Sequence, residues 1–168
     1  MPAARARVVV VAAAEGASRV AADTDRRRAQ RLSLAALTAR GAAIARALHA
    51  PALVTLSGDL GTGKTTLVQA ICTALGVTAP VTSPTFALIH EYAAPGTRVV
   101  HCDLYRLASP RDVASLGLDD VLADPTAILL VEWPDRAGAL LPVPTLAITL
   151  LHVPGDAAVR RCTESWSG

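Results

Sequence analysis

The stretch that decides the fold is Leu56–Gln69, LSGDLGTGKTTLVQ, which holds the only lysine in a chain with 16 lysine and arginine residues. Residues 58–65 fit the pattern G-x-x-x-x-G-K-[ST] of a phosphate-binding loop, or P-loop. In such a loop the backbone N–H groups turn inward around a polyphosphate, and the following helix points its positive end at the same phosphates. The pattern therefore predicts a nucleotide-binding site.

The lone lysine suits this loop better than an arginine would. A lysine ammonium is a compact charge on a flexible stem that can reach between the β- and γ-phosphates, whereas a guanidinium is planar and forked. Thr65 follows Lys64 and would place its hydroxyl on a bound Mg²⁺. We expect the loop to bind the nucleotide through Gly58, Asp59, Gly61, Thr62, Gly63, Lys64, Thr65 and Thr66.

The sequence around the loop has the required strand and helix. PALVTL (51–56) is typical of a short buried strand, and Leu67, Ile71 and Leu75 recur at helical spacing before Gly76. An earlier helix is predicted from Ser33, a suitable N-cap, with Gly41 on its apolar face, where it would allow close packing against a sheet.

Further strands are indicated by apolar runs at 86–92 and 97–103, around the turn AAPG, and at 126–133 and 145–153. With 168 residues and 52% hydrophobic residues, the chain is long enough for one domain. Strands alternating with helices predict a three-layer α/β P-loop NTPase domain over residues 33–168. Its sheet is expected to be mainly parallel with antiparallel additions.

The N-terminal segment, residues 1–32, is expected to hold a possible first strand at 7–13 and then a basic, flexible stretch. Residues 1–50 carry nine arginines against three acidic residues, a net charge of +6, whereas residues 51–168 carry seven cations against eleven acids. Arg26–Arg28 and Arg31 could contact RNA phosphates, but a solvated and mobile segment is the favoured interpretation.

The cysteines and the apolar runs indicate the cellular compartment of the protein. Cys72, Cys102 and Cys162 are odd in number and form no metal-binding pattern, which suits a reducing compartment. No apolar run approaches the roughly 20 residues of a membrane-spanning helix. The N-terminal apolar run bears a faint likeness to a signal peptide, yet it also fits a first strand. We expect a cytoplasmic protein.

Two carboxylates could serve the nucleotide. Glu132 ends the apolar run 127–131, and Asp103 ends the less apolar run 98–102. One would bind Mg²⁺ and the other would orient the attacking water, and the residues alone leave open which does which. Ser83 and Thr85, in the loop after the P-loop helix, offer hydroxyls that could sense the γ-phosphate.

Other chemistries are less favoured. His101-x-Asp103 has no evident third metal ligand, and an Asn-Lys-x-Asp guanine signature is excluded because Lys64 is the only lysine. ATP is therefore the expected nucleotide. A small-molecule kinase remains an alternative, although the arginines after the P-loop are dispersed rather than gathered in a lid. A nucleotide-controlled binding module with negligible catalysis is a third possibility.

Four motifs in order resemble one family. GDLGTGKTTLVQAI (58–71), VTSPTFALIHEY (81–92), HCDLYRL (101–107) and LLVEWPDRAGALLP (129–142) are similar to the TsaE family. These are small P-loop ATPases of bacterial threonylcarbamoyladenosine synthesis on tRNA. The resemblance covers roughly residues 33–153. The chain departs from the family at Thr62, where alanine is usual, and in its longer and more basic segment 1–32.

The resemblance implies binding and slow hydrolysis of ATP with Mg²⁺. It places Thr65 and Glu132 at the metal, makes Asp103 and the Ser83–Thr85 loop switch elements, and has Trp133 line the site. Together with Lys64, these two carboxylates would be the catalytic residues. The implied partner is a TsaD–TsaB heterodimer, in which TsaD transfers the threonylcarbamoyl group to the adenosine beside the anticodon. Contact with tRNA would then be indirect.

Overall fold

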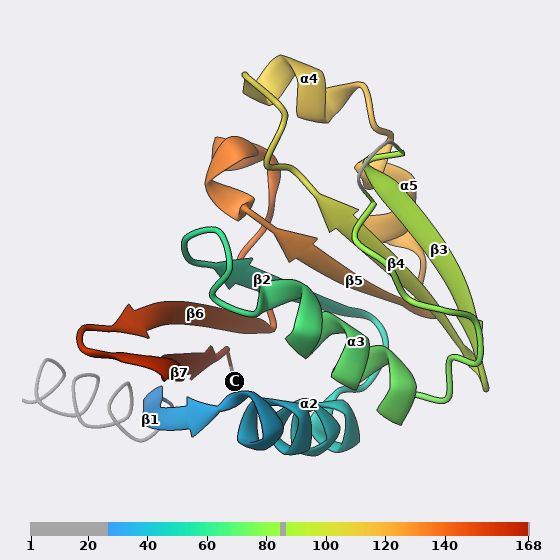
Figure 1. Ribbon diagram of the computed structural model, residues 1–168. Helices are drawn as coiled ribbons and strands as arrows, with labels where there is room; N and C mark the ends of the chain where they lie inside the picture. The colour runs from blue at the N-terminus through green and yellow to red at the C-terminus, as the bar shows by residue number, and fades with distance from the viewer. Residues whose placement is uncertain (1–26, 85–86, 168) are drawn as a thin grey trace, which may run out of the picture.

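The computed structural model describes residues 27–84 and 87–167. Its seven strands form one sheet (Figure 1) in the order β1 (Arg27–Ser33), β7 (Asp156–Trp166), β6 (Leu146–Val153), β2 (Ala52–Ser57), β5 (Ala127–Glu132), β4 (Thr97–Asp103) and β3 (Ile89–Ala94). The helices are α2 (Leu34–Ala47), α3 (Lys64–Ala74), α4 (Pro110–Ala114) and α5 (Leu118–Ala123), with 3₁₀ turns η1 (Pro134–Arg136) and η2 (Gly138–Leu140).

The sheet is mixed. Strands β6, β2, β5 and β4 are parallel to one another at the centre, while β3 adds to β4 in the antiparallel sense. At the other edge β7 is antiparallel to both β6 and β1. The expected α/β class with antiparallel additions is confirmed. The antiparallel share is larger than expected, because the chain after β6 returns as β7 and pairs with β1.

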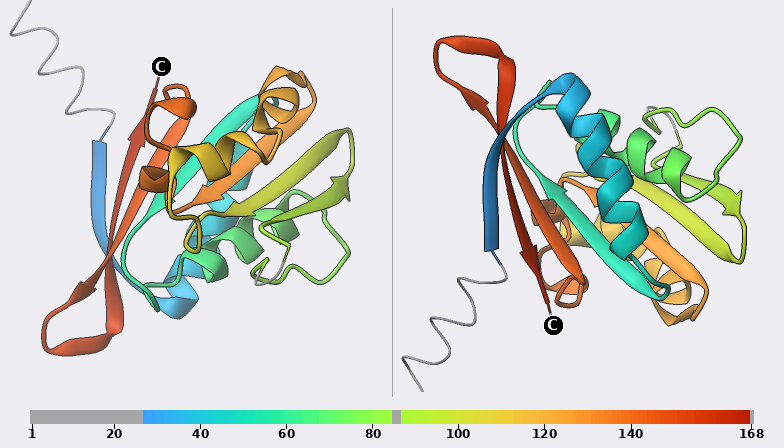
Figure 2. Two further views of the ribbon diagram at one scale, coloured as in Figure 1. Left: turned by 90° about the horizontal axis from the view of Figure 1, so that it is seen from above. Right: turned by 90° about the horizontal axis from the view of Figure 1, so that it is seen from below.

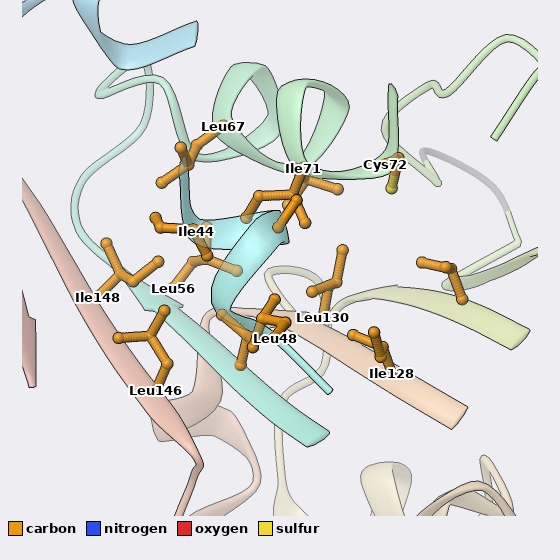
Figure 3. Close-up of a cluster of buried hydrophobic side chains, with 14 of the residues drawn as sticks. Ile44, Leu48, Leu56, Leu67, Ile71, Cys72, Ile128, Leu130, Leu146 and Ile148 are labelled. Carbon is orange, nitrogen blue, oxygen red and sulfur yellow. The ribbon is translucent and has the colours of Figure 1, made fainter. Parts of the chain in front are cut away.

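Helices cover both faces of the sheet, which confirms the three layers (Figure 2). Alternate side chains of a strand point to opposite faces. Accordingly, Ile128 and Leu130 of β5 pack in the cluster under α2 and α3, shown in Figure 3, whereas Leu129 and Val131 pack in the cluster under α4 and α5. Both faces of β5 are buried, which is why its sequence is a continuous apolar run.

The close packing expected at Gly41 occurs, but against a helix and not a sheet. A Cβ at Gly41 would lie 2.6 Å from the Cβ of Ala70 on α3. The absence of a side chain therefore lets α2 lie directly on α3, and this contact holds the helix that begins at the P-loop.

Part of the arginine-rich stretch is ordered, which differs from the expected mobile segment. Arg27–Ser33 form strand β1 and pair over their whole length with β7. Gln30 and Leu32 are half-buried, while Arg31 between them is exposed. Arginine side chains can therefore face solvent from an edge strand. The strand was not predicted because its sequence has no β-branched residue. The strand predicted at 7–13 lies outside the described residues.

A buried ion pair fastens α2 to β7. The guanidinium of Arg40 donates from Nε to Oε1 of Glu164 at 2.6 Å and from Nη2 to Oε2 at 2.5 Å. Glu164 is fully buried, and its contact raises the pKa of Arg40. Paired in this way, the carboxylate is tolerated inside the protein.

Replacing Arg40 with alanine is expected to lower the free energy of unfolding by about 3 kcal/mol, because removing one partner strands a buried charge. Urea unfolding followed by circular dichroism measures the change. Arg46→Ala on the same helix is the control, since Arg46 is exposed and its loss should cost less than about 0.5 kcal/mol. Equal losses in the two variants would show that the ion pair contributes nothing.

Within residues 27–84 and 87–167, no helix is both long enough and apolar enough to cross a membrane.

Candidate nucleotide-binding site

The P-loop connects the end of β2 to the first turn of α3, and its shape depends on two glycines. Gly58 has φ +136°, and a Cβ there would lie 2.1 Å from the carbonyl oxygen of Leu150 on β6. Gly63 has φ +99°, and its Cβ would lie 2.9 Å from Cδ2 of Leu37 on α2. A side chain at residue 58 would therefore push the loop off β6, and at both positions the positive φ disfavours any residue with a Cβ.

Lys64 lies inside this loop and is only 4% exposed. Its Nζ donates to the carbonyl oxygens of Gly58 at 2.7 Å and Asp59 at 2.9 Å. The ring of Trp133 covers the ammonium, with its centroid 4.1 Å from Nζ. Burial lowers the pKa of Lys64, and the negative charges of Glu132, Asp103 and Asp59 oppose that shift. The ammonium is thus held by carbonyls, an aromatic face and nearby carboxylates.

Glu132 meets the P-loop helix at the C-terminal end of β5. Because it follows Leu130 by two residues, its side chain lies on the sheet face covered by α3. Oε1 of Glu132 accepts a hydrogen bond from Thr65 Oγ1 at 2.9 Å, so the structure brings these two residues together. The carboxylate is buried.

His101 is a site residue that the sequence analysis weighed only as a metal ligand. Its Nε2 lies 3.0 Å from Oε1 of Glu132, and the ring is fully buried. A carboxylate oxygen can only accept, so a hydrogen bond to it requires the tautomer in which Nε2 is the donor. The signal was present in the spacing: His101 and Asp103 are two residues apart on β4 and share one face of the sheet with Glu132.

Asp103 lies opposite Glu132 in the register of β4 and β5. Its Oδ1 accepts from the backbone N–H of Tyr105 at 3.0 Å, and its Oδ2 accepts from Ser83 Oγ at 3.3 Å. The structure therefore brings Ser83 and Asp103 together. Thr85 lies outside the described residues.

Trp133 has a left-handed backbone with φ 59°, which is unfavourable for a bulky residue. The backbone N–H of Trp133 donates to the carbonyl oxygen of Leu56 at 3.1 Å, so the turn after β5 is bound to the end of β2. The ring also lies 4.9 Å from that of Tyr105, measured between centroids. This strained turn places the indole over Lys64, and strain of this kind is typical of functional sites.

These residues surround a cleft of about 350 Å³ at the C-terminal ends of the parallel strands. Of the predicted residues, it is lined by Gly61, Gly63, Lys64, Thr65, Thr66, Ser83, Asp103, Glu132 and Trp133. Three predicted residues, Gly58, Asp59 and Thr62, do not line the cleft. Thr62 is fully buried, and its Oγ1 donates to the carbonyl oxygen of Asp59 at 2.8 Å. These three residues therefore shape the loop. The lining residues that sequence reasoning missed are Leu34, Leu60, Tyr105 and Arg160.

The carboxylates of the cleft do not form a metal site by themselves. Among the described residues there is no group of three or more histidine, cysteine or acidic side chains that could hold an ion. Thr65 Oγ1 and the Glu132 carboxylate are oxygen donors of the kind Mg²⁺ prefers, and Mg²⁺ commonly takes its remaining ligands from water and phosphate oxygens. The donor set therefore fits a metal that arrives with a nucleotide.

Comparison with known proteins agrees with the geometry. A family model described as "Threonylcarbamoyl adenosine biosynthesis protein TsaE" matches residues 32–161. The tRNA threonylcarbamoyladenosine biosynthesis protein TsaE of Rickettsia bellii is 35% identical over 118 residues, 68% of this chain and 78% of that protein. The protein of that name from Streptomyces coelicolor is 38% identical over 133 residues, 76% of this chain and 88% of the other. The crystal structure of Bacillus subtilis YdiB aligns with a TM-score of 0.71 at 29% identity, over 84% of this chain and 86% of that one. The chain belongs to the TsaE family, whose members carry a name that places them in threonylcarbamoyladenosine biosynthesis.

Proposed function

We propose that this protein binds ATP with Mg²⁺, hydrolyses it slowly, and thereby supports the threonylcarbamoyl modification of tRNA. The observation that carries the proposal is the 2.9 Å hydrogen bond between Thr65 and Glu132, next to the buried Lys64. It brings the hydroxyl of the P-loop helix and the carboxylate of β5 to one point at the wall of the cleft. A hydroxyl, a carboxylate and a lysine in this arrangement are the parts that phosphoryl transfer requires.

Each polar residue of the cleft has a separate task in this proposal. Lys64 would neutralise charge on the β- and γ-phosphates, and Thr65 with Glu132 would hold Mg²⁺, which supplies charge neutralisation when bound. Asp103, which accepts hydrogen bonds at both oxygens, would orient the attacking water. The exposed side chains of Leu34 and Leu60 would provide an apolar surface for the adenine ring of ATP.

Hydrolysis is expected to be slow because no mobile arginine lines the cleft within residues 27–84 and 87–167. Arg160 is the only arginine that lines it among the described residues, and its guanidinium already donates to three backbone carbonyls. An arginine that can reach the transferring phosphoryl group accelerates such reactions by orders of magnitude. Without one, the charge that develops in the transition state is only partly neutralised.

Incubation with ATP and Mg²⁺, followed by separation of the products, tests the activity. Release of phosphate supports an ATPase. A phosphorylated acceptor in the presence of candidate small molecules would indicate a kinase, and unchanged ATP over hours would leave a binding module. Because the relatives are named for threonylcarbamoyladenosine biosynthesis, the experiment that follows tests binding to the tRNA-modifying complex. The proposed cellular location is the cytoplasm.

A TsaD–TsaB heterodimer is the proposed partner, and nucleotide would control the interaction. Ser83 contacts Asp103 at the cleft, and Arg106 donates from Nη2 to the carbonyl of Pro84 at 3.4 Å, so the 81–84 loop and the segment after β4 are joined. Tyr105 on that segment is exposed. A phosphate that changes the environment of Asp103 would therefore alter a surface that a partner can contact.

We expect the TsaD–TsaB pair to bind this protein more tightly with ATP than with ADP, by about 5-fold or more, the lower range of a typical coupling between sites. Calorimetry with the purified pair in low salt measures both affinities. Absence of binding in both nucleotide states would remove this partner from the proposal and leave the ATPase.

A further inference from the structure

The β6–β7 hairpin lies beside the P-loop (Figure 1) and contacts it. The carbonyl of Leu150 on β6 fills the space where a side chain of residue 58 would lie. Further along the hairpin, Nε2 of His152 lies 3.2 Å from the carbonyl oxygen of Leu60, and Nη2 of Arg160 lies 3.3 Å from the carbonyl oxygen of Gly61. Two consecutive carbonyls of the loop are thus bound from outside by one hairpin.

The two donors form a cross-strand pair. His152 on β6 is directly opposite Arg160 on β7, and the register of the hairpin shifts immediately after His152. Nη1 of Arg160 donates to the carbonyls of Ala157 and Val159 within this irregular part of β7. The guanidinium therefore fixes the hairpin's own backbone and extends to the P-loop from it.

Arg160 is an unusual cation for a buried position. It is 8% exposed, and no carboxylate among the described residues forms an ion pair with it. Its hydrogen-bond partners are backbone carbonyls from the hairpin and the P-loop, while its Nε is buried without a partner. A buried charge is retained at a cost, which suggests a role in holding these carbonyls.

The orientation of a carbonyl sets the orientation of the next N–H. Both groups belong to one planar trans peptide and point in opposite directions. A donor that holds the Leu60 carbonyl on the hairpin side therefore turns the N–H of Gly61 to the other side, and Gly61 lines the cleft. The contact on the Gly61 carbonyl likewise fixes the N–H of Thr62, which closes the turn on the carbonyl of Asp59 at 3.3 Å.

We propose that His152 and Arg160 are a positioning pair, which holds the carbonyls of Leu60 and Gly61 outward and keeps the P-loop in its phosphate-binding shape. The inference rests on the proposed binding of a nucleotide at this loop. His152 does not line the cleft, so an effect of its loss on nucleotide affinity must pass through the loop. Arg160 lines the cleft and could also contact a ligand, so His152 gives the decisive test.

The experiment compares His152→Ala, His152→Gln, Arg160→Ala and the parent in titrations with a fluorescent ATP analogue and Mg²⁺. Loss of one hydrogen bond corresponds to about 2- to 10-fold in affinity, and this is the expected weakening for His152→Ala. His152→Gln keeps a side-chain N–H donor and should retain most of the parent affinity. Arg160→Ala should weaken binding at least as much as His152→Ala.

Arg161→Ala is the matched control, because Arg161 is the exposed neighbour of Arg160 on β7. It removes the same charge without a contact to the P-loop and should leave the affinity unchanged. Thermal melting and amide hydrogen exchange of residues 60–63, both without nucleotide, separate positioning from global stability. Faster exchange of the loop at an unchanged melting temperature is expected for His152→Ala.

Parent affinity and parent exchange in His152→Ala would overturn the positioning pair. An effect of equal size in Arg161→Ala would overturn it too, because the loss would then follow charge alone. If the parent itself bound no nucleotide, the proposed function would fail, and the pair would be judged from the exchange of the loop amides.

Discussion

Replacing Lys64 with alanine is expected to abolish ATP hydrolysis while the protein stays folded. In the proposed reaction the lysine would supply positive charge where the transferring phosphoryl group develops negative charge, and loss of one such group costs about 10²- to 10³-fold in rate. The structure adds that Nζ is held by the carbonyls of Gly58 and Asp59 and lies under the ring of Trp133. Phosphate release under saturating ATP measures the loss, and circular dichroism checks the fold.

Lys64→Arg should fail as well, and this variant separates charge from shape. An ammonium fits between two carbonyls and an indole face, and Lys64 as a whole is 4% exposed. A guanidinium is wider, planar and forked, so it cannot keep the same contacts. Hydrolysis by Lys64→Arg at the parent rate would contradict the explanation for the single lysine of the chain.

The P-loop and the strand that ends in Glu132 could be predicted because their signals are local. The glycine spacing, the lysine and the flanking strand and helix lie within residues 51–76, and β5 is an unbroken apolar run ahead of its carboxylate. Both patterns follow from chemistry within one segment. Neither requires knowledge of which strands become neighbours.

The parts that were missed depend on pairing between distant segments. His101 becomes a partner of Glu132 only because β4 lies beside β5, with Asp103 opposite Glu132. His152 and Arg160 reach the P-loop only because β7 folds back and pairs with β6. The polar sequence of β7 does not predict this pairing. Strand β1 was missed because its sequence has no β-branched residue and because its partner, β7, lies at the far end of the chain.

The two carboxylates should fail in different ways when their charges are removed. Glu132→Gln keeps the size of the side chain and an oxygen that can accept from Thr65 and His101, but removes the charge next to the expected metal. Affinity for ATP in the presence of Mg²⁺ is expected to fall by about 10-fold or more, as for other changes around metal ligands. In EDTA the affinity should match that of the parent.

Asp103→Asn should retain nucleotide and lose turnover. Its carboxylate accepts from Tyr105 N–H and from Ser83, so its position is fixed by neighbours and the asparagine can occupy the same place. An amide cannot take a proton from water, and loss of a general base typically costs about 10²- to 10⁴-fold in rate. Titration of both variants with a fluorescent ATP analogue, with and without Mg²⁺, is paired with single-turnover hydrolysis. Equal loss of binding in the two variants would mean that both carboxylates serve the metal, because only a shared ligand role removes Mg²⁺-dependent affinity at either position.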